Sequence, residues 1–194
     1  MHDVISDHRG LTLIEVIVSL LIASLVLLAV TGFLMVSTRT YRTNSMETSL
    51  QMESQIALNQ IDDLLMKASS YEWVNDIVID GVAYPVLGMK AMEETKGGAI
   101  EYYYAVIHDT LHKQLRFRKV KKEEVGESSF QQSLKHIVEE ELKETPSLLA
   151  NYVSSLWVSP ATNKKENLVT VSILLELDGR TFSSFSSISM RNRN

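Results

Sequence analysis

The feature that most constrains this chain is an apolar segment near its N-terminus. Residues 16–36 contain no charged side chain. A helix rises about 1.5 Å per residue, so about 20 apolar residues match a hydrocarbon core of about 30 Å. The polar residues of the segment, Ser19, Ser24 and Thr31, can bond back to backbone carbonyls one turn earlier. The segment therefore predicts a helix that spans a membrane.

A cleaved secretory signal peptide is the main alternative to a membrane anchor. Such a peptide has a basic start, an apolar run of about 7–15 residues, and a cleavage site of small residues after that run. Here the apolar run is longer, and residues 35–42 at and after its end (MVSTRTYR) offer no such site. The pattern therefore favours an anchor.

A single carboxylate, Glu15, stands directly before the apolar run. A lone charge at membrane depth costs about 2–3 kcal/mol or more, so such a residue usually has a partner. No basic residue lies within one helical turn downstream of Glu15. If the chain were cut after Gly10, the new α-amine of Leu11 would lie four residues away, one turn along the helix. That amine could neutralise Glu15 in its own chain or in a neighbouring one.

The residues around this junction, RGLTLIEV from Arg9 to Val16, resemble the prepilin signature of type IV pilins and type II secretion pseudopilins. The resemblance implies that a membrane peptidase cuts between Gly10 and Leu11, and that Leu11 is then N-methylated. It also implies that Glu15 docks against the terminal amine of an adjacent subunit in a filament. The precursor would be a single-pass protein of the cytoplasmic membrane with its N-terminus inside. The mature form would lie in a pilus at the cell surface or in a filament on the periplasmic side.

The chain departs from the family pattern in two respects. The first mature residue would be Leu11, where the family most often has Phe. The leader carries one fixed positive charge, Arg9, against two Asp, while Arg39 and Arg42 follow the apolar run. The positive-inside rule therefore does not decide the orientation, which rests on the resemblance alone.

Helical periodicity continues beyond the apolar run. No Pro precedes Pro85, and no Gly lies between Gly32 and Gly81. Apolar residues recur at 3- and 4-residue steps, with Ser54 in the one gap of the stripe. The stripe consists of Met46, Leu50, Ala57, Ile61, Leu64 and Ala68. We expect one helix from Leu11 to Lys67, whose second half lays this face on a globular domain. The alternative is a membrane helix followed by a separate surface helix.

After residue 70 the apolar pattern changes to period two, which predicts strands. A short, irregular strand pair is expected over residues 76–87, interrupted at Gly81 and Pro85. A hairpin is expected over residues 99–120, with its turn at 108–110 and Leu111 on the packed face of the returning strand. Residues 121–133 are expected to form a solvated loop.

Residues 134–144 predict a short amphipathic helix, and the rest of the chain predicts strands. The packed face of the helix would carry Leu134, Ile137, Val138, Glu141 and Leu142.

Strands are expected at 153–158, 168–177 and 181–190, with a polar loop at 160–167. Asp178–Gly179 predicts a tight hairpin turn between the last two. The spacing of Phe182, Phe185, Ile188 and Met190 breaks period two, which predicts a bulge in the last strand. The ending SISMRN, residues 187–192, resembles the C-terminal strand of PilW-like minor pilins and of the related J-type minor pseudopilins.

Together these elements predict an α+β fold: a long N-terminal helix packed by its second half on an antiparallel β-sheet domain. We expect a prepilin leader at 1–10, a transmembrane and assembly half of the helix at 11–38, an amphipathic half at 39–69, and a sheet domain at 70–194. The predicted function is a structural subunit, a minor pilin or pseudopilin. Its expected partners are other pilins, the prepilin peptidase and membrane lipid. The alternative is a single-span binding or receptor protein that keeps its leader and does not polymerise.

Catalytic and cofactor motifs do not emerge from the sequence. The chain has no cysteine, and it lacks the nucleophile-elbow, zinc-protease, phosphate-loop and dinucleotide-binding motifs. A net charge of −5 with mixed signs gives no nucleic-acid footprint. We therefore expect no enzyme activity, no cofactor, no metal and no small-molecule substrate.

Three weaker patterns have simpler structural explanations. His108 and His112 have the spacing of a helical metal pair, but they flank a predicted turn and are expected at the surface. Asp76, Asp80 and Asp178 could suggest a calcium loop, yet turn chemistry explains each of them. The run from Tyr102 to Tyr104 could form a binding platform, although strand propensity accounts for it better.

Overall fold

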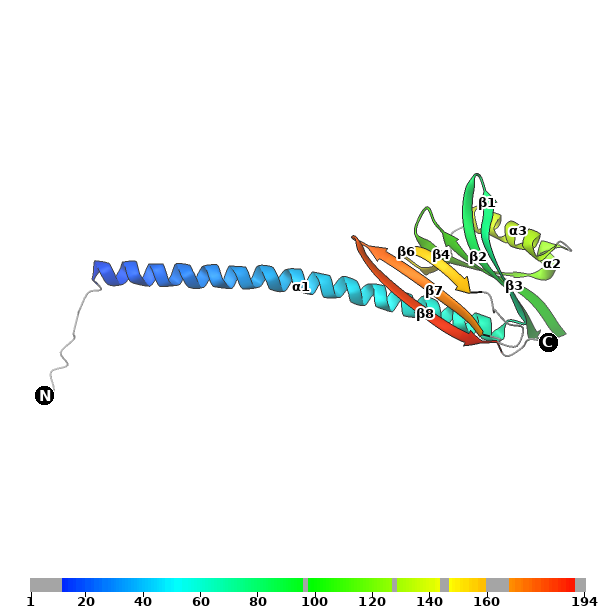
Figure 1. The fold of residues 1–194 in the computed structure, drawn as a ribbon, viewed down its shortest axis with the longest axis horizontal. Helices are drawn as coiled ribbons and strands as arrows, with labels where there is room; N and C mark the ends of the chain where they lie inside the picture. Colours follow the sequence, from blue (N-terminus) through cyan, green and yellow to red (C-terminus); the bar gives the residue numbers. More distant parts are fainter. Residues whose placement is uncertain (1–11, 96–97, 127–128, 144–146, 160–167, 191–194) are drawn as a thin grey trace. The chain divides into compact units, whose positions relative to one another are not determined.

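The computed structural model describes residues 12–95, 98–126, 129–143, 147–159 and 168–190. Internal contacts divide the chain into two compact units, Met1–Ser45 and Met46–Asn194. The first unit contains the beginning of helix α1 (Leu13–Lys67). The second contains the rest of that helix and all the strands that the structure describes (Figure 1).

Helix α1 is continuous from Leu13 to Lys67 and confirms the prediction of one helix over this range. Its beginning at Leu11 lies outside the described residues. The predicted stripe is also confirmed, because Leu50, Ser54, Ala57, Ile61 and Ala68 are buried. Met46 and Leu64 are half-buried. The stripe is wider than predicted, since two further side chains, Leu58 and Leu65, are also buried.

Two antiparallel sheets pack on α1, where the sequence predicted one. The first has five strands in chain order: β1 (Ser70–Ile79), β2 (Val82–Thr95), β3 (Gly98–Asp109), β4 (Gln114–Lys121) and β5 (Leu148–Ala150). The second has three strands in chain order: β6 (Val153–Ser159), β7 (Leu168–Leu177) and β8 (Arg180–Ser189). Period two reveals which residues share a face, but it does not reveal which strands pair.

The main core lies between α1 and the inward faces of both sheets. It joins Leu50, Ile61 and Leu65 of the helix to Met89 and Val106 of the five-stranded sheet and to the alternating apolar residues of β7. These residues of β7 are Val169, Val171, Ile173 and Leu175. The fold class predicted from the sequence, a helix packed by its second half on antiparallel strands, is confirmed.

A second core covers the other face of the five-stranded sheet. Helix α3 (Phe130–Lys143) packs there through Leu134, Ile137 and Val138, and Figure 1 shows it on this side with the short helix α2 (Lys122–Val125). The approach is close at Gly88 of β2, where an added Cβ would lie 2.5 Å from a methyl group of Leu134. Glu141 is also buried on this face. Arg118 and the backbone N–H of Ser147 bind its carboxylate and so offset the cost of burying the charge.

The prediction of a short, irregular strand pair at 76–87 was wrong in extent. β1 and β2 are long strands joined by a two-residue turn at Asp80 and Gly81, both with positive φ. Pro85 does not interrupt β2, although it has no N–H to donate. The pairing register shifts between Val74 and Ile77, so a bulge in β1 lies opposite the proline.

Other boundaries also differ from the predictions. The turn after β3 lies at residues 110–113 instead of 108–110, because the Asp109 side chain accepts hydrogen bonds from the N–H groups of Leu111 and His112. Leu111 is therefore exposed in this turn. Residues 122–125 and 130–133, which were predicted to be loop, are helical. The short strand β5 was not predicted.

Helix α3 begins at Phe130, earlier than the predicted start at residue 134, and a capping box stabilises its first turn. Ser129 and Gln132 exchange hydrogen bonds, the Ser129 N–H donating to Gln132 Oε1 at 3.2 Å and the Gln132 N–H donating to Ser129 Oγ at 3.4 Å. This is a capping box, which satisfies N–H groups that have no partner within the helix. Phe130 then packs edge-on against Tyr103, with ring centroids 5.1 Å apart.

The last hairpin has the predicted strands and turn but no bulge. β7 pairs with β8 in continuous register from Leu168 with Ser189 to Leu177 with Arg180. Phe185 departs from the apolar spacing because it lies on the outer face, where its side chain is 72% exposed. The predicted loop at 160–167 lies outside the described residues.

Candidate functional site

Helix α1 begins with a capping box that involves the predicted assembly residue. The backbone N–H and the hydroxyl of Thr12 each donate a hydrogen bond to Glu15 Oε2 at 2.8 Å. The Glu15 N–H in turn approaches Thr12 Oγ1 at 3.4 Å. The T-x-x-E pattern therefore holds the Glu15 carboxylate at the N-terminus of the helix, where the helix dipole also favours a negative charge. Gly10 and Leu11 lie outside the described residues.

The helix surface that follows Glu15 is apolar and uncovered within its unit. All side chains from residue 12 to residue 42 are exposed, and the segment is long and apolar enough to cross a membrane. Two of the three polar residues singled out from the sequence satisfy their hydroxyls within the helix. Ser24 Oγ donates to the Leu21 carbonyl at 2.8 Å, and Thr31 Oγ1 donates to the Leu27 carbonyl at 2.6 Å.

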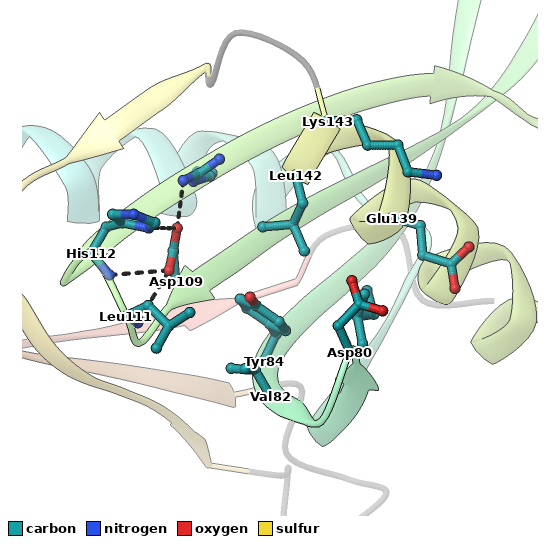
Figure 2. A pocket seen from close by; sticks show the side chains of 11 residues that line it. Asp80, Val82, Tyr84, Asp109, Leu111, His112, Glu139, Leu142 and Lys143 are labelled. Atoms are coloured by element: carbon teal, nitrogen blue, oxygen red, sulfur yellow. Dashed lines mark hydrogen bonds and ion pairs between the residues drawn. The ribbon is translucent and has the colours of Figure 1, made fainter.

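A buried polar cluster forms a second candidate site in the globular unit (Figure 2). Asp109, at the end of β3, lies at its centre and is fully buried. Its Oδ2 contacts Arg116 of β4 at 2.5 Å and His112 Nδ1 at 2.8 Å. Its Oδ1 accepts the two backbone N–H groups of the β3–β4 turn. Asp109 therefore fixes both the turn and the Arg116 side chain.

The protein environment shifts the pKa values of three side chains in and near this cluster, Asp109, Tyr84 and His108. Burial alone would raise the pKa of Asp109, but hydrogen bonds from His112 and the Arg116 charge hold it below its ordinary value. Burial, together with the negative charge of Asp109, raises the pKa of the Tyr84 hydroxyl. Burial lowers the pKa of His108, although the Val153 carbonyl 3.1 Å from its Nε2 opposes that shift. At neutral pH Asp109 is thus charged and His108 is neutral.

The two histidines do not form the helical pair that their spacing allowed. His108 lies in β3 and is 3% exposed, so the expectation of a surface histidine was wrong for this residue. The side chain of His112 is 65% exposed in the turn and is oriented by Asp109. Among the described residues, no group of three or more His, Cys, Asp or Glu side chains could hold a metal ion.

The remaining candidates have structural roles. Asp80 and Asp178 adopt positive φ in Asp–Gly hairpin turns, and Asp76 lies in the bulged part of β1. Tyr102 to Tyr104 alternate between the two faces of β3, so Tyr103 and Tyr104 are buried in different cores. The tyrosines therefore do not make one platform.

Sequence reasoning missed Thr12 and the group formed by Tyr84, Asp109 and Arg116. The T-x-x-E spacing could have revealed Thr12, because it is the sequence pattern of a capping box. No comparable pattern marks the other three residues. They come from β2, β3 and β4, and the pairing of these strands brings them together.

Comparison with known families concerns the N-terminal part of the chain. The prokaryotic N-terminal methylation motif matches residues 5–31. This is the motif of a pilin-like precursor. The match spans the Gly10–Leu11 junction, Glu15 and most of the apolar run, and it supports the resemblance to type IV pilins and pseudopilins. No curated protein gives a significant match to the chain. Together with the apolar helix, the motif supports a membrane-anchored precursor that a prepilin peptidase processes.

Proposed function

We propose that this protein is a structural subunit, a minor pilin or pseudopilin, of a type IV pilus-like filament. The peptidase cuts between Gly10 and Leu11, Leu11 is N-methylated, and the mature chain assembles through α1. The observation that carries this proposal is the methylation motif at residues 5–31, because it includes both the junction and Glu15. The narrower assignment to PilW-like or J-type subunits rests on the resemblance of the end of the chain to the C-terminal strand of those subunits.

The exposed apolar surface of α1 supports assembly by helix packing. A contiguous apolar surface of this length is not stable in water and must be covered by lipid or by other helices. Within a membrane, helices associate through close packing of their side chains and through polar contacts. The described helix surface offers few free polar groups, because Ser24, Thr31 and Thr38 donate their hydroxyls to their own helix.

Glu15 supplies the polar contact in this proposal. Its carboxylate binds Thr12, but two carboxylate oxygens have about four acceptor sites, so the group can also accept the α-amine of a neighbouring subunit. A charge that enters an apolar bundle without a partner costs several kcal/mol. A subunit inserted at the wrong height would therefore be disfavoured.

The class of the protein is tested by the intact mass of the chain after extraction from the membrane. A mature chain that starts at Leu11 and carries an N-methyl group supports the proposal. Gly10→Val should leave the full precursor, because a side chain at Gly10 would obstruct a peptidase that binds extended backbone closely. Gly32→Val is the matched control, since a Cβ at Gly32 meets no atom within 4 Å and the site lies away from the junction.

The alternative, a receptor that does not polymerise, predicts the opposite results. Its leader would remain uncut in the wild-type chain, and Gly10→Val would change nothing. Normal cleavage of Gly10→Val would likewise refute the leader assignment.

A further inference from the structure

A cavity of about 620 Å³ opens in the globular unit between the β1–β2 turn, the β3–β4 turn and α3 (Figure 2). Its volume lies in the range of about 300–1,000 Å³ that is typical of ligand pockets. Part of its wall is aliphatic, formed by Ile79, Val82, Leu111 and Leu142. Such a wall suits the apolar part of a ligand.

Tyr84 presents an unused polar group to this cavity. The residue is 5% exposed, and its hydroxyl forms no hydrogen bond with any residue that the structure describes. Figure 2 shows the hydroxyl pointing into the space between Asp109 and Asp80. The hydroxyl oxygen itself is open to the cavity, so it can bind a polar group of a ligand in place of water.

Of the three carboxylates that line the cavity, one has hydrogen-bond and ion-pair partners among the described residues and two have no ion pair there. Asp109 is bound by Arg116, His112 and two backbone N–H groups. Asp80 and Glu139 form no ion pair with the described residues. Arg116 is engaged by Asp109, so the other fixed charges of the lining are those of Asp80, Glu139 and Lys143, which sum to −1. The unpaired charge on the side of Asp80 and Glu139 is therefore negative, which disfavours an anionic ligand.

We propose that this cavity binds a primary ammonium group on an aliphatic stem, the chemistry of a lysine side chain or of a small alkylamine. The stem would pack on the aliphatic wall, as lysine stems do on apolar surfaces. An ammonium group has three N–H donors. In Figure 2 Asp80 lies between Tyr84 and Glu139, so the ammonium group would bind Asp80 together with one of these two neighbours. This site is independent of the N-terminal assembly machinery.

The test measures ligand binding by saturation-transfer NMR, with the full chain in lipid nanodiscs and empty nanodiscs as the blank. The probes are N-acetyl-lysine methylamide, its norleucine analogue (which has an uncharged stem), its glutamate analogue, and butylamine. We expect saturation of the lysine methylene groups. Asp80→Asn, and either Glu139→Gln or Tyr84→Phe, should weaken binding about three- to tenfold.

Asp178→Asn is the matched control, because Asp178 occupies the same kind of Asp–Gly turn as Asp80 but lies outside the cavity. It should bind the lysine probe as the wild type does, and thermal unfolding followed by tryptophan fluorescence should show that each variant is folded. Binding of butylamine as well indicates a free amine as the ligand, and binding of the lysine probe alone indicates a protein side chain. The proposal is overturned if no probe binds, if the norleucine or glutamate analogue binds as well as lysine does, or if Asp178→Asn weakens binding equally.

Discussion

At the scale of single residues, the two functions of Glu15 can be separated by two substitutions. Glu15→Gln keeps a side chain that can complete the capping box, as Gln132 does in α3, but it removes the charge. Glu15→Val removes both. The loss of charge should ease membrane insertion by about 2–3 kcal/mol, so a defect in function cannot come from failed insertion. We expect both variants to insert, and both to be incorporated poorly into filaments.

The measurement is recovery of other pilins with the tagged protein, together with filament counts, at matched membrane abundance. If Gln restores assembly and Val does not, then the capping box matters and the charge does not. Wild-type assembly of both variants would remove Glu15 from the assembly mechanism.

Asp109 predicts how the stability of the globular unit depends on pH. Its folded pKa is lowered by hydrogen bonds from His112 and by the Arg116 charge, which outweigh the opposing effect of burial. The stabilisation is therefore present above the ordinary value of 3.8 and is lost as the pH falls through the folded pKa. Asp109→Asn should cost about 3 kcal/mol at pH 7, because it leaves the buried Arg116 charge unpaired. The difference from wild type should shrink below pH 4.

Asp62 of α1 has a pKa shift of the opposite sign to that of Asp109, so it provides the control for the pH dependence of stability. Burial raises its pKa, although the Ser186 hydroxyl donates to it at 2.7 Å. Its favourable contribution is present below 3.8 and is lost as the pH rises through the folded pKa. Asp62→Asn should therefore stabilise the protein at pH 7 and not at pH 3. Fluorescence of Trp73 and Trp157 during denaturant unfolding reports on the globular unit in both cases.

At the scale of the elements, the register of β8 predicts different roles for its two phenylalanines. Phe182 packs against the main core, whereas Phe185 is 72% exposed on the opposite face. Phe182→Ser should lower the free energy of unfolding by about 2 kcal/mol. Phe185→Ser should change it by less than about 0.5 kcal/mol. Equal losses, measured by denaturant unfolding, would mean that a bulge places both rings on the same face.

The sequence predicted the elements better than it predicted their partners. The stripe of α1, the alternation of β7 and the Asp178–Gly179 turn follow from short-range periodicity, which is fixed by neighbouring residues. The division into two sheets and the tolerance of Pro85 depend on strand pairing, which one strand alone does not encode. The same limit applies to the sites. Thr12 and Glu15 are three residues apart and form a recognisable motif, whereas the Tyr84 cavity is assembled from distant segments.

At the scale of the whole molecule, the distribution of the core predicts where the chain can be divided. Leu50 is the core residue nearest to the N-terminus in the two core clusters. The boundary between the two compact units lies between Ser45 and Met46. Removal of residues 1–38 therefore deletes no core side chain that the structure describes. It does delete the apolar surface that requires lipid.

We expect residues 39–194 to form a soluble, folded monomer. Its melting temperature, followed by circular dichroism, should lie within a few degrees of that of the globular unit in the full chain. A fragment of residues 62–194 is the control, because it also lacks Leu50, Ala57, Leu58 and Ile61 and so exposes the faces that both sheets turn toward α1. Loss of three large buried aliphatic side chains costs about 6–15 kcal/mol, as much as the whole stability of a typical domain, so this shorter fragment should aggregate. If residues 39–194 are insoluble or unfolded while the full chain is folded, then the globular unit depends on the membrane segment for its stability. If the shorter fragment folds equally well, then α1 is not the centre of the core.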